Sequence, residues 1–116
     1  MVTAETVDWS VVFETLANEE RRAVLRILTA DQGTISVDDV ARRLAVDPDD
    51  EKAVHRARVQ LHHIHLPKLN EAGLIVWSRD QGTVRETALM YRLPVGVISS
   101  EPVTADLASQ QRQVSD

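Results

Sequence analysis

The sequence predicts a mainly α-helical domain with one small β hairpin, which is the α+β fold class. Up to about residue 66, apolar residues recur every three to four positions, as on one face of a helix. From Leu74 onward they alternate with polar residues, as in strands, on both sides of the turn signal Asp80-Gln81-Gly82. A length of 116 residues suits one domain with one core. We expect this domain at residues 8–98 and a mobile tail at residues 99–116.

The first two helices are predicted by apolar stripes that each follow a capping residue. The first stripe consists of Trp9, Val12, Phe13 and Leu16. The second stripe consists of Ala23, Val24, Ile27 and Leu28. Asp8 and Asn18 have the short polar side chains that cap helix starts, and Glu19 and Glu20 suit the positive end of the second helix dipole. Gly33 breaks the pattern of the second helix.

A short strand at Thr34 and Ile35 precedes a third helix. Ser36, with Asp39 three positions later, resembles a capping box. The inward stripe of this helix consists of Val37, Val40, Ala41 and Leu44. The helix is expected to end near Ala45.

The fourth helix is expected at residues 48–66. Asp47 is the capping residue, Pro48 takes the first helical position, and three acids at 49–51 fill the first turn. Pro67 is expected to kink or end the helix, because its ring removes one hydrogen bond and clashes with the carbonyl four residues back. A last helical turn to Gly73 fits the sequence. At about 100° per residue, the inward residues are Val54, Ala57, Leu61 and Ile64.

The hairpin is expected at residues 74–93. Its first strand runs from Leu74 to Arg79, its returning strand runs from Thr83 to Leu93, and Pro94 stops the second strand. The apolar segment at 95–98 is expected to pack back on the body of the domain.

This order of elements, with two helices around a short turn followed by a hairpin, is that of a winged helix-turn-helix domain. An α-helix fits the DNA major groove, and a hairpin beside it reaches phosphate or the minor groove. We therefore expect helix 48–66 to read double-stranded DNA and hairpin 74–93 to flank the DNA. The outward residues of the helix, which have side chains able to contact bases or phosphate, are Lys52, Arg56, Val59, Gln60 and His63. The alternative interpretation of this face is an ordinary solvated helix surface.

Arginines and acids around this helix favour different partners. Arg79 and Arg85 flank the hairpin turn, where they either contact phosphate or lie on an exposed turn. Four further arginines are expected to pair with neighbouring acids: Arg21, Arg22, Arg42 and Arg43. Asp49, Asp50 and Glu51 crowd the start of the DNA-reading helix and would repel phosphate. These acids support an alternative function, a winged-helix module that binds protein and has no specific DNA binding.

Three segments, LANEERRAVLRIL, ISVDDVARRLAV and LPKLNEAGLI, resemble the ArsR-type winged-helix regulators. The longer stretch LHHIHLPKLNEAGLI is closer to a family of small winged-helix proteins of halophilic archaea. The resemblance covers about residues 10 to 93, and it implies DNA binding and transcriptional regulation, usually as a dimer. ArsR-type metal sensors commonly carry a cysteine pair at the helix after the short strand. This chain has no cysteine, so the metal-sensing role does not carry over.

The charge balance does not decide the function. Eighteen Asp and Glu residues face thirteen Lys and Arg residues, a net charge of −5, and only Lys52 and Lys68 among the thirteen are lysines. Such an excess argues against a simple basic patch, but it is also common in proteins of high-salt cytoplasms, where the Debye length is only about 3 Å. The absence of cysteine excludes disulfides. With no signal-like start and no membrane-length apolar run, the sequence predicts a cytoplasmic protein without membrane contact.

The sequence predicts neither an enzyme nor a metal or cofactor site. All four histidines lie within eleven residues: His55, His62, His63 and His65. His55 and His62 share one helical side, but a metal would need a third ligand, so core-edge or capping roles are favoured. No phosphate-binding glycine loop, zinc-protease motif or nucleophile elbow occurs in the sequence.

A homodimer is expected, with Trp9 and Phe13 forming the interface together with Val95–Ile98, and burial within the monomer is the alternative. These two residues are among only four aromatic side chains in a domain with a small interior. A DNA-binding dimer would hold its two reading helices about 34 Å apart.

Overall fold

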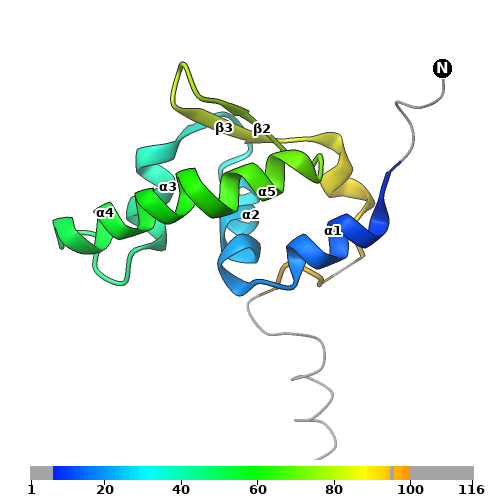
Figure 1. Cartoon of the computed structure of the whole chain (residues 1–116), viewed down its shortest axis with the longest axis horizontal. Coiled ribbons are helices and arrows are strands. Elements are labelled where there is room, and N and C mark those ends of the chain that lie inside the picture. The colour runs from blue at the N-terminus through cyan, green and yellow to red at the C-terminus, as the bar shows by residue number, and fades with distance from the viewer. Residues whose placement is uncertain (1–6, 95, 100–116) are drawn as a thin grey trace, which may run out of the picture.

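The computed structural model describes residues 7–94 and 96–99. The elements in chain order are α1 (Trp9–Leu16), α2 (Glu19–Asp31), β1 (Ile35–Ser36), α3 (Val37–Leu44), α4 (Glu51–Gln60), the π-helical turn η2 (Leu61–His65), α5 (Leu66–Glu71), β2 (Ile75–Ser78), β3 (Thr83–Glu86) and the 3-10 helix η3 (Ala88–Arg92). The described part is mainly helical with a small antiparallel sheet, which confirms the α+β class. In Figure 1, α4, η2 and α5 form one long rod, with the β2–β3 hairpin above it.

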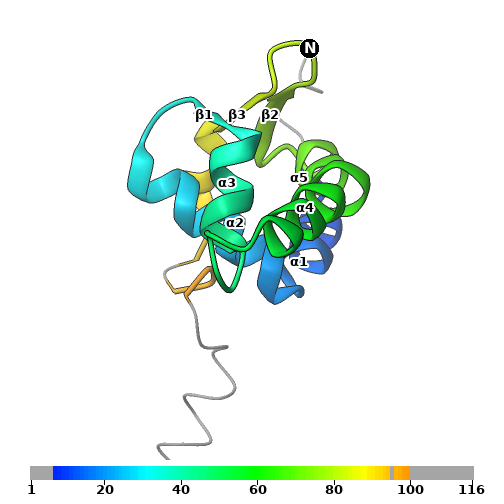
Figure 2. The same cartoon turned by 90° about the vertical axis from the view of Figure 1, so that its left-hand side faces the viewer.

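The sheet joins a strand from the helical half to the hairpin. Its order is β1-β3-β2, with Ile35 opposite Val84 and Trp77 on the other side of Val84. Ile35 and Val84 are buried, so the sheet turns one face toward the helices. Because β1 lies between α2 and α3, its pairing with β3 fixes the hairpin against these helices. Figure 2, seen from the α4 end, shows α3 beside α4 with the sheet above them.

The core is built chiefly from leucines of α2, the long rod and the start of the hairpin. The fully buried leucines are Leu25, Leu28, Leu61, Leu66, Leu69 and Leu74. Each contributes about 1.5–3 kcal/mol of transfer free energy when removed from water. The rod therefore forms a large part of the core, and the outer face of α4 is held on a well-packed body.

No helix among the described residues is long and apolar enough to cross a membrane.

The predicted caps of the first three helices are confirmed. Asp8 accepts hydrogen bonds from the N–H groups of Ser10 and Val11 at 3.1 and 3.3 Å. Asn18 caps α2 with its nearest contact at 2.8 Å, and Ser36 caps α3 at 3.0 Å. The boundaries of these helices are therefore set by local chemistry.

Burial along α1 and α2 departs from the predicted stripes. Phe13, for which a dimer interface is expected and burial within the monomer is the alternative, has a side chain that is 46% exposed. Ala23 and Ile27 are only half-buried. The side chains that α2 buries are Arg21, Val24, Leu25 and Leu28. The buried face of α2 is thus rotated from the predicted one, because α2 packs against α1, α3 and β3 together.

The fourth helix begins later than the sequence predicts. α4 starts at Glu51, and its cap is Asp50, whose carboxylate accepts two backbone N–H groups of the first turn at 3.0 and 3.4 Å. Asp47 accepts instead from the N–H of Asp49 at 3.0 Å and shapes the preceding turn. The sequence offers two capping residues three positions apart, and the structure uses the second of them.

A π-helical turn interrupts the rod just before Pro67. The N–H of Leu66 donates to the carbonyl of Leu61, five residues back in place of the usual four. This wider turn accommodates a proline that lacks an N–H and would crowd a regular helix. The rod consequently continues through α5 to Glu71, and the predicted stop or kink after Leu66 is replaced by a change of helical register.

The π turn also changes which side chains face the core. The prediction that Ile64 lies inward is wrong, because this side chain is 39% exposed. His65 is buried in its place and is only 3% exposed. A turn with an extra residue shifts the inward positions, and the spacing of apolar residues does not reveal it.

The returning strand is shorter than predicted. β3 ends at Glu86 and not at Leu93. The N–H of Thr87 donates to the carbonyl of Leu74 at 3.0 Å, and the Thr87 hydroxyl donates to the carbonyl of Gly73 at 2.6 Å, which closes the base of the hairpin. The next segment, ALMYR, is rich in helix formers and folds as η3.

The segment after η3 returns to the body, as predicted. Val97 and Ile98 pack against the core, and the Nη1 atom of Arg26 on α2 donates to the carbonyl of Ile98 at 2.6 Å. Val95 and the greater part of the expected tail, residues 100–116, lie outside the described residues.

Candidate nucleic-acid interface

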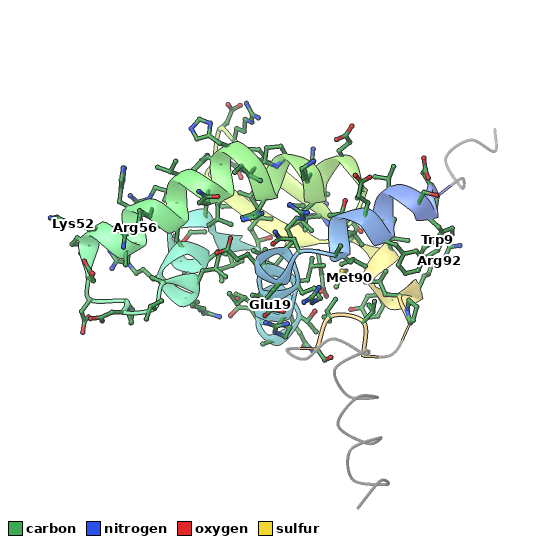
Figure 3. The ribbon with its side chains drawn as sticks, turned by 60° about the horizontal axis from the view of Figure 1, so that its bottom comes forward. Trp9, Glu19, Lys52, Arg56, Met90 and Arg92 are labelled. Carbon is green, nitrogen blue, oxygen red and sulfur yellow. The ribbon has the colours of Figure 1, made fainter. Side chains whose placement is uncertain are left out.

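The outer face of α4 consists of exposed side chains on a helix with a firmly held inner side. Asp50 caps its start, and Val54 on its inner side is fully buried, as is Leu61 at the beginning of η2. The five residues predicted to face outward are all exposed: Lys52, Arg56, Val59, Gln60 and His63. Figure 3 shows Lys52 and Arg56 on α4, at the end of the molecule opposite Trp9 and Arg92.

The lysine and the arginine on this face have no side-chain partner, whereas most of the other arginines do. Within the described residues, neither Lys52 nor Arg56 takes part in an ion pair or side-chain hydrogen bond. Arg58, two residues after Arg56 on α4, pairs with Asp38 of α3 at 2.8 Å. This ion pair fastens α4 to α3, whereas the hydrogen-bond donors of Lys52 and Arg56 have no acceptor among the described side chains.

Three of the four arginines predicted to pair with acids do so. Arg22 lies 2.9 Å from Glu19. Arg42 lies 3.9 Å from Glu51, and Arg43 lies 3.1 Å from Asp39 and 3.4 Å from Asp31. For Arg21 the prediction is wrong. This side chain is 8% exposed and donates from Nε to the carbonyl of Thr15 at 2.6 Å.

Arg21 belongs to a buried bridge that the sequence did not predict. Its Nη1 atom lies 3.4 Å from Nδ1 of His65, whose Nε2 atom lies 2.8 Å from Oε1 of Glu20. Because a guanidinium only donates, Nδ1 accepts and the imidazole proton resides on Nε2, which donates to Glu20. Burial lowers the pKa of Arg21 from its ordinary value. The bridge connects the start of α2 to the π turn that orients α4.

Hairpin arginines lie in two different environments. The Arg79 guanidinium stacks over the Trp77 ring, 4.4 Å from its centroid, and His62 of η2 meets the same ring edge-on at 5.6 Å. This stack holds the hairpin against the rod. Arg85 is exposed and, within the described residues, has neither an ion pair nor a ring contact. Arg85 is therefore the freer cation of the two.

The acids before α4 mostly have structural partners. Asp50 caps the helix, Asp47 caps the preceding turn, and Glu51 lies 3.9 Å from Arg42. The carboxylate of Asp49 is exposed and forms no ion pair or hydrogen bond within the described residues. Asp49 is therefore the one acid of this group without a partner among the described residues.

The histidine cluster is dispersed by the structure. His55 and His63 are exposed, His62 meets Trp77, and His65 is buried in the bridge. Across residues 7–94 and 96–99, no three His, Asp or Glu side chains gather in an arrangement that could hold a metal ion.

Comparisons with known proteins give one match. Residues 13–85 match the family model described as "Domain of unknown function (DUF7344)", a span that runs from α1 into β3. No curated protein and no solved structure matches the chain.

Proposed function

The chain belongs to the DUF7344 family, and we propose that it is a cytoplasmic winged helix-turn-helix regulator that binds double-stranded DNA. In this proposal α3 and α4 form the helix-turn-helix, α4 is the recognition helix and the β2–β3 hairpin is the wing. The observation that carries the proposal is the pair of unpartnered cations, Lys52 and Arg56, on the outer face of α4.

The arrangement of elements supports this assignment. α3 packs against α4 through the Arg58–Asp38 ion pair, as the first helix of such a motif packs against the recognition helix. β1 completes a three-stranded sheet with the hairpin, and the Trp77 stack fastens the hairpin to the rod. A recognition helix and a wing held to one body can contact neighbouring parts of a duplex.

The side chains on α4 suit base and phosphate contacts. Arg56 can bind guanine through two parallel hydrogen bonds, Gln60 can bind adenine, and Val59 can contact a thymine methyl group. Lys52 and Arg85 supply phosphate contacts that depend on salt. The resemblance of three segments to ArsR-type regulators and to winged-helix proteins of halophilic archaea agrees with this assignment.

Selection from a random duplex library tests the function. The full chain should enrich one sequence motif, and its affinity for that duplex should exceed that for a scrambled duplex by about a thousandfold or more at equal salt. A pull-down of cross-linked DNA from cells should give sharp genomic peaks that carry the same motif. A chain that enriches no motif and gives no peaks would instead support a protein-binding module, for which the exposed Asp49 and the fully exposed Val46 beside it are suitable contacts.

A further inference from the structure

A groove runs along the side of α4 that faces the start of α2 and the end of α3. It encloses about 390 Å³, within the range of about 300–1,000 Å³ typical of small-ligand sites. Its walls include Ala45, Ala53 and Ala57, whose short side chains leave the space unfilled, and Leu44, which adds a larger apolar surface. The groove can therefore take a flat or compact apolar group.

Polar groups of opposite charge stand along this groove. Arg56 and Gln60 line it from α4, and neither has a side-chain hydrogen bond or ion pair within the described residues. Glu20 and His65 also line it. His65 donates to Oε1 of Glu20 at 2.8 Å, so Oε2 of that carboxylate is available to a donor. A few convergent polar groups in an apolar groove are what a site uses to orient a small ligand.

We propose that this groove binds a small organic monocarboxylate with an apolar body, and that the bound ligand withdraws Arg56 from DNA. The carboxylate pairs with Arg56 and accepts from the Gln60 amide, while the apolar body lies on the alanines. The Glu20 carboxylate repels a second anionic group and favours a hydroxyl or amine donor on the ligand. The effect on DNA rests on the proposed function, whereas ligand binding does not.

Nuclear magnetic resonance titration of the DNA-free full chain with 4-hydroxybenzoate tests the site. Saturable shifts are expected at the backbone amides of Ala53 and Ala57. Terephthalate, a dianion of similar shape, and 4-hydroxybenzyl alcohol, which lacks the carboxylate, should each bind at least about tenfold more weakly. Absence of saturable shifts below about 10 mM 4-hydroxybenzoate, or equal binding of all three probes, would overturn the proposal.

Variants separate this site from general charge attraction. Arg56→Ala should weaken 4-hydroxybenzoate binding at least about tenfold, whereas the matched control Arg85→Ala should change it by less than about twofold. Ala53→Leu should block binding while Arg56 stays in place, and a thermal melt checks that this variant folds. Equal losses in the two arginine variants would overturn the proposal even if Ala53→Leu does not fold.

Competition with DNA tests the proposal that the bound ligand withdraws Arg56 from DNA. Saturating 4-hydroxybenzoate should lower the affinity of the chain for its selected duplex at least about fivefold, and Ala53→Leu should remove this effect. Ligand binding without any effect on DNA affinity would overturn that part of the proposal. If no duplex binds at all, the proposed function fails, and the proposed effect of the ligand on DNA binding fails with it. The titration still decides whether the groove binds the ligand.

Discussion

His65→Ala should destabilise the protein far more than Ile64→Ala, although Ile64 is the larger apolar side chain. His65 is 3% exposed and bridges Arg21 to Glu20, whereas Ile64 is 39% exposed. If residues 48–66 formed a regular α-helix, Ile64→Ala would be the more destabilising substitution, because the inward stripe of that helix includes Ile64. The pair of substitutions therefore reports directly on the π turn.

The expected loss follows from what His65 contacts. Removing the ring leaves a buried Arg21 N–H without its acceptor, which costs about 1–3 kcal/mol. The vacated space adds about 1–2 kcal/mol, because the surroundings collapse only in part. The bond to Glu20 adds no more than about 1 kcal/mol, since the Glu20 side chain is 64% exposed and water replaces the imidazole. The free energy of unfolding should thus fall by about 3 kcal/mol, and by less than about 1 kcal/mol for Ile64→Ala.

Urea unfolding at pH 7 measures both values. For a domain of this size, the His65→Ala loss corresponds to a drop of about 10–20 °C in the thermal midpoint. His65→Gln should recover part of it, because an amide offers both an acceptor for Arg21 and a donor for Glu20. Equal losses for His65→Ala and Ile64→Ala, or a larger loss at Ile64, would refute the π turn and the bridge.

Three further predictions concern charge, pH and assembly. Asp49→Asn should strengthen the proposed DNA binding by about 0.5–1 kcal/mol near 0.1 M salt and by less at molar salt, since it removes an unpartnered negative charge at the start of the proposed recognition helix and leaves the Asp50 cap intact. Weaker binding in a filter or anisotropy assay would contradict this. The hydrogen bond from Arg26 lowers the pKa of Glu19 below its ordinary value of 4.5. The stability that this contact contributes is therefore complete above pH 4.5, and it is lost as the pH falls through the lower pKa that Glu19 has in the folded state. Glu19→Gln should therefore cost up to about 1 kcal/mol at pH 7, and parent and variant should converge in acid; a gap that persists at low pH would argue against the ion pair. Phe13 is 46% exposed, and its ring centroid lies 5.8 Å from that of Trp9. The chain should therefore be a dimer in light scattering at micromolar concentration, and Phe13→Asp should make it a monomer. A monomeric parent would contradict this interface.

The sequence alone predicts those features of this fold that depend on short-range chemistry. The caps Asp8, Asn18 and Ser36 lie where the structure has them, because a cap bonds to N–H groups two or three residues away. The hairpin turn follows for the same reason. The α+β class then results from the order of elements, which needs no knowledge of their packing.

Features that depend on tertiary contacts escaped prediction. Asp47 and Asp50 have the same capping side chain, so local chemistry does not distinguish them, and the structure uses Asp50. The π turn arises because the core on both sides of Pro67 keeps the rod continuous, and a helical periodicity does not contain that information. Ile64 was consequently assigned to the inside in place of His65.

The candidate site was predicted unevenly. Lys52 and Arg56 were assigned to the outer face from periodicity, since they precede the π turn and keep regular spacing from Val54. Their freedom from ion pairs required the structure, because an arginine can pair with an acid far away in the sequence, as Arg58 does with Asp38. The contact between Arg21 and His65 joins residues 44 positions apart and had no signal in the sequence beyond the histidine cluster before Pro67.

Binding of the selected duplex by Arg56→Ala and Arg85→Ala across a range of salt tests the central claim most directly. Both side chains are exposed, so both variants should fold as the parent does. Arg56→Ala should cost about 1–3 kcal/mol on the selected duplex and relax its preference over other sequences. Arg85→Ala should weaken all duplexes alike and reduce the salt slope by about one unit. If Arg56→Ala binds the selected duplex as tightly as the parent and keeps its sequence preference, α4 is not the helix that reads DNA.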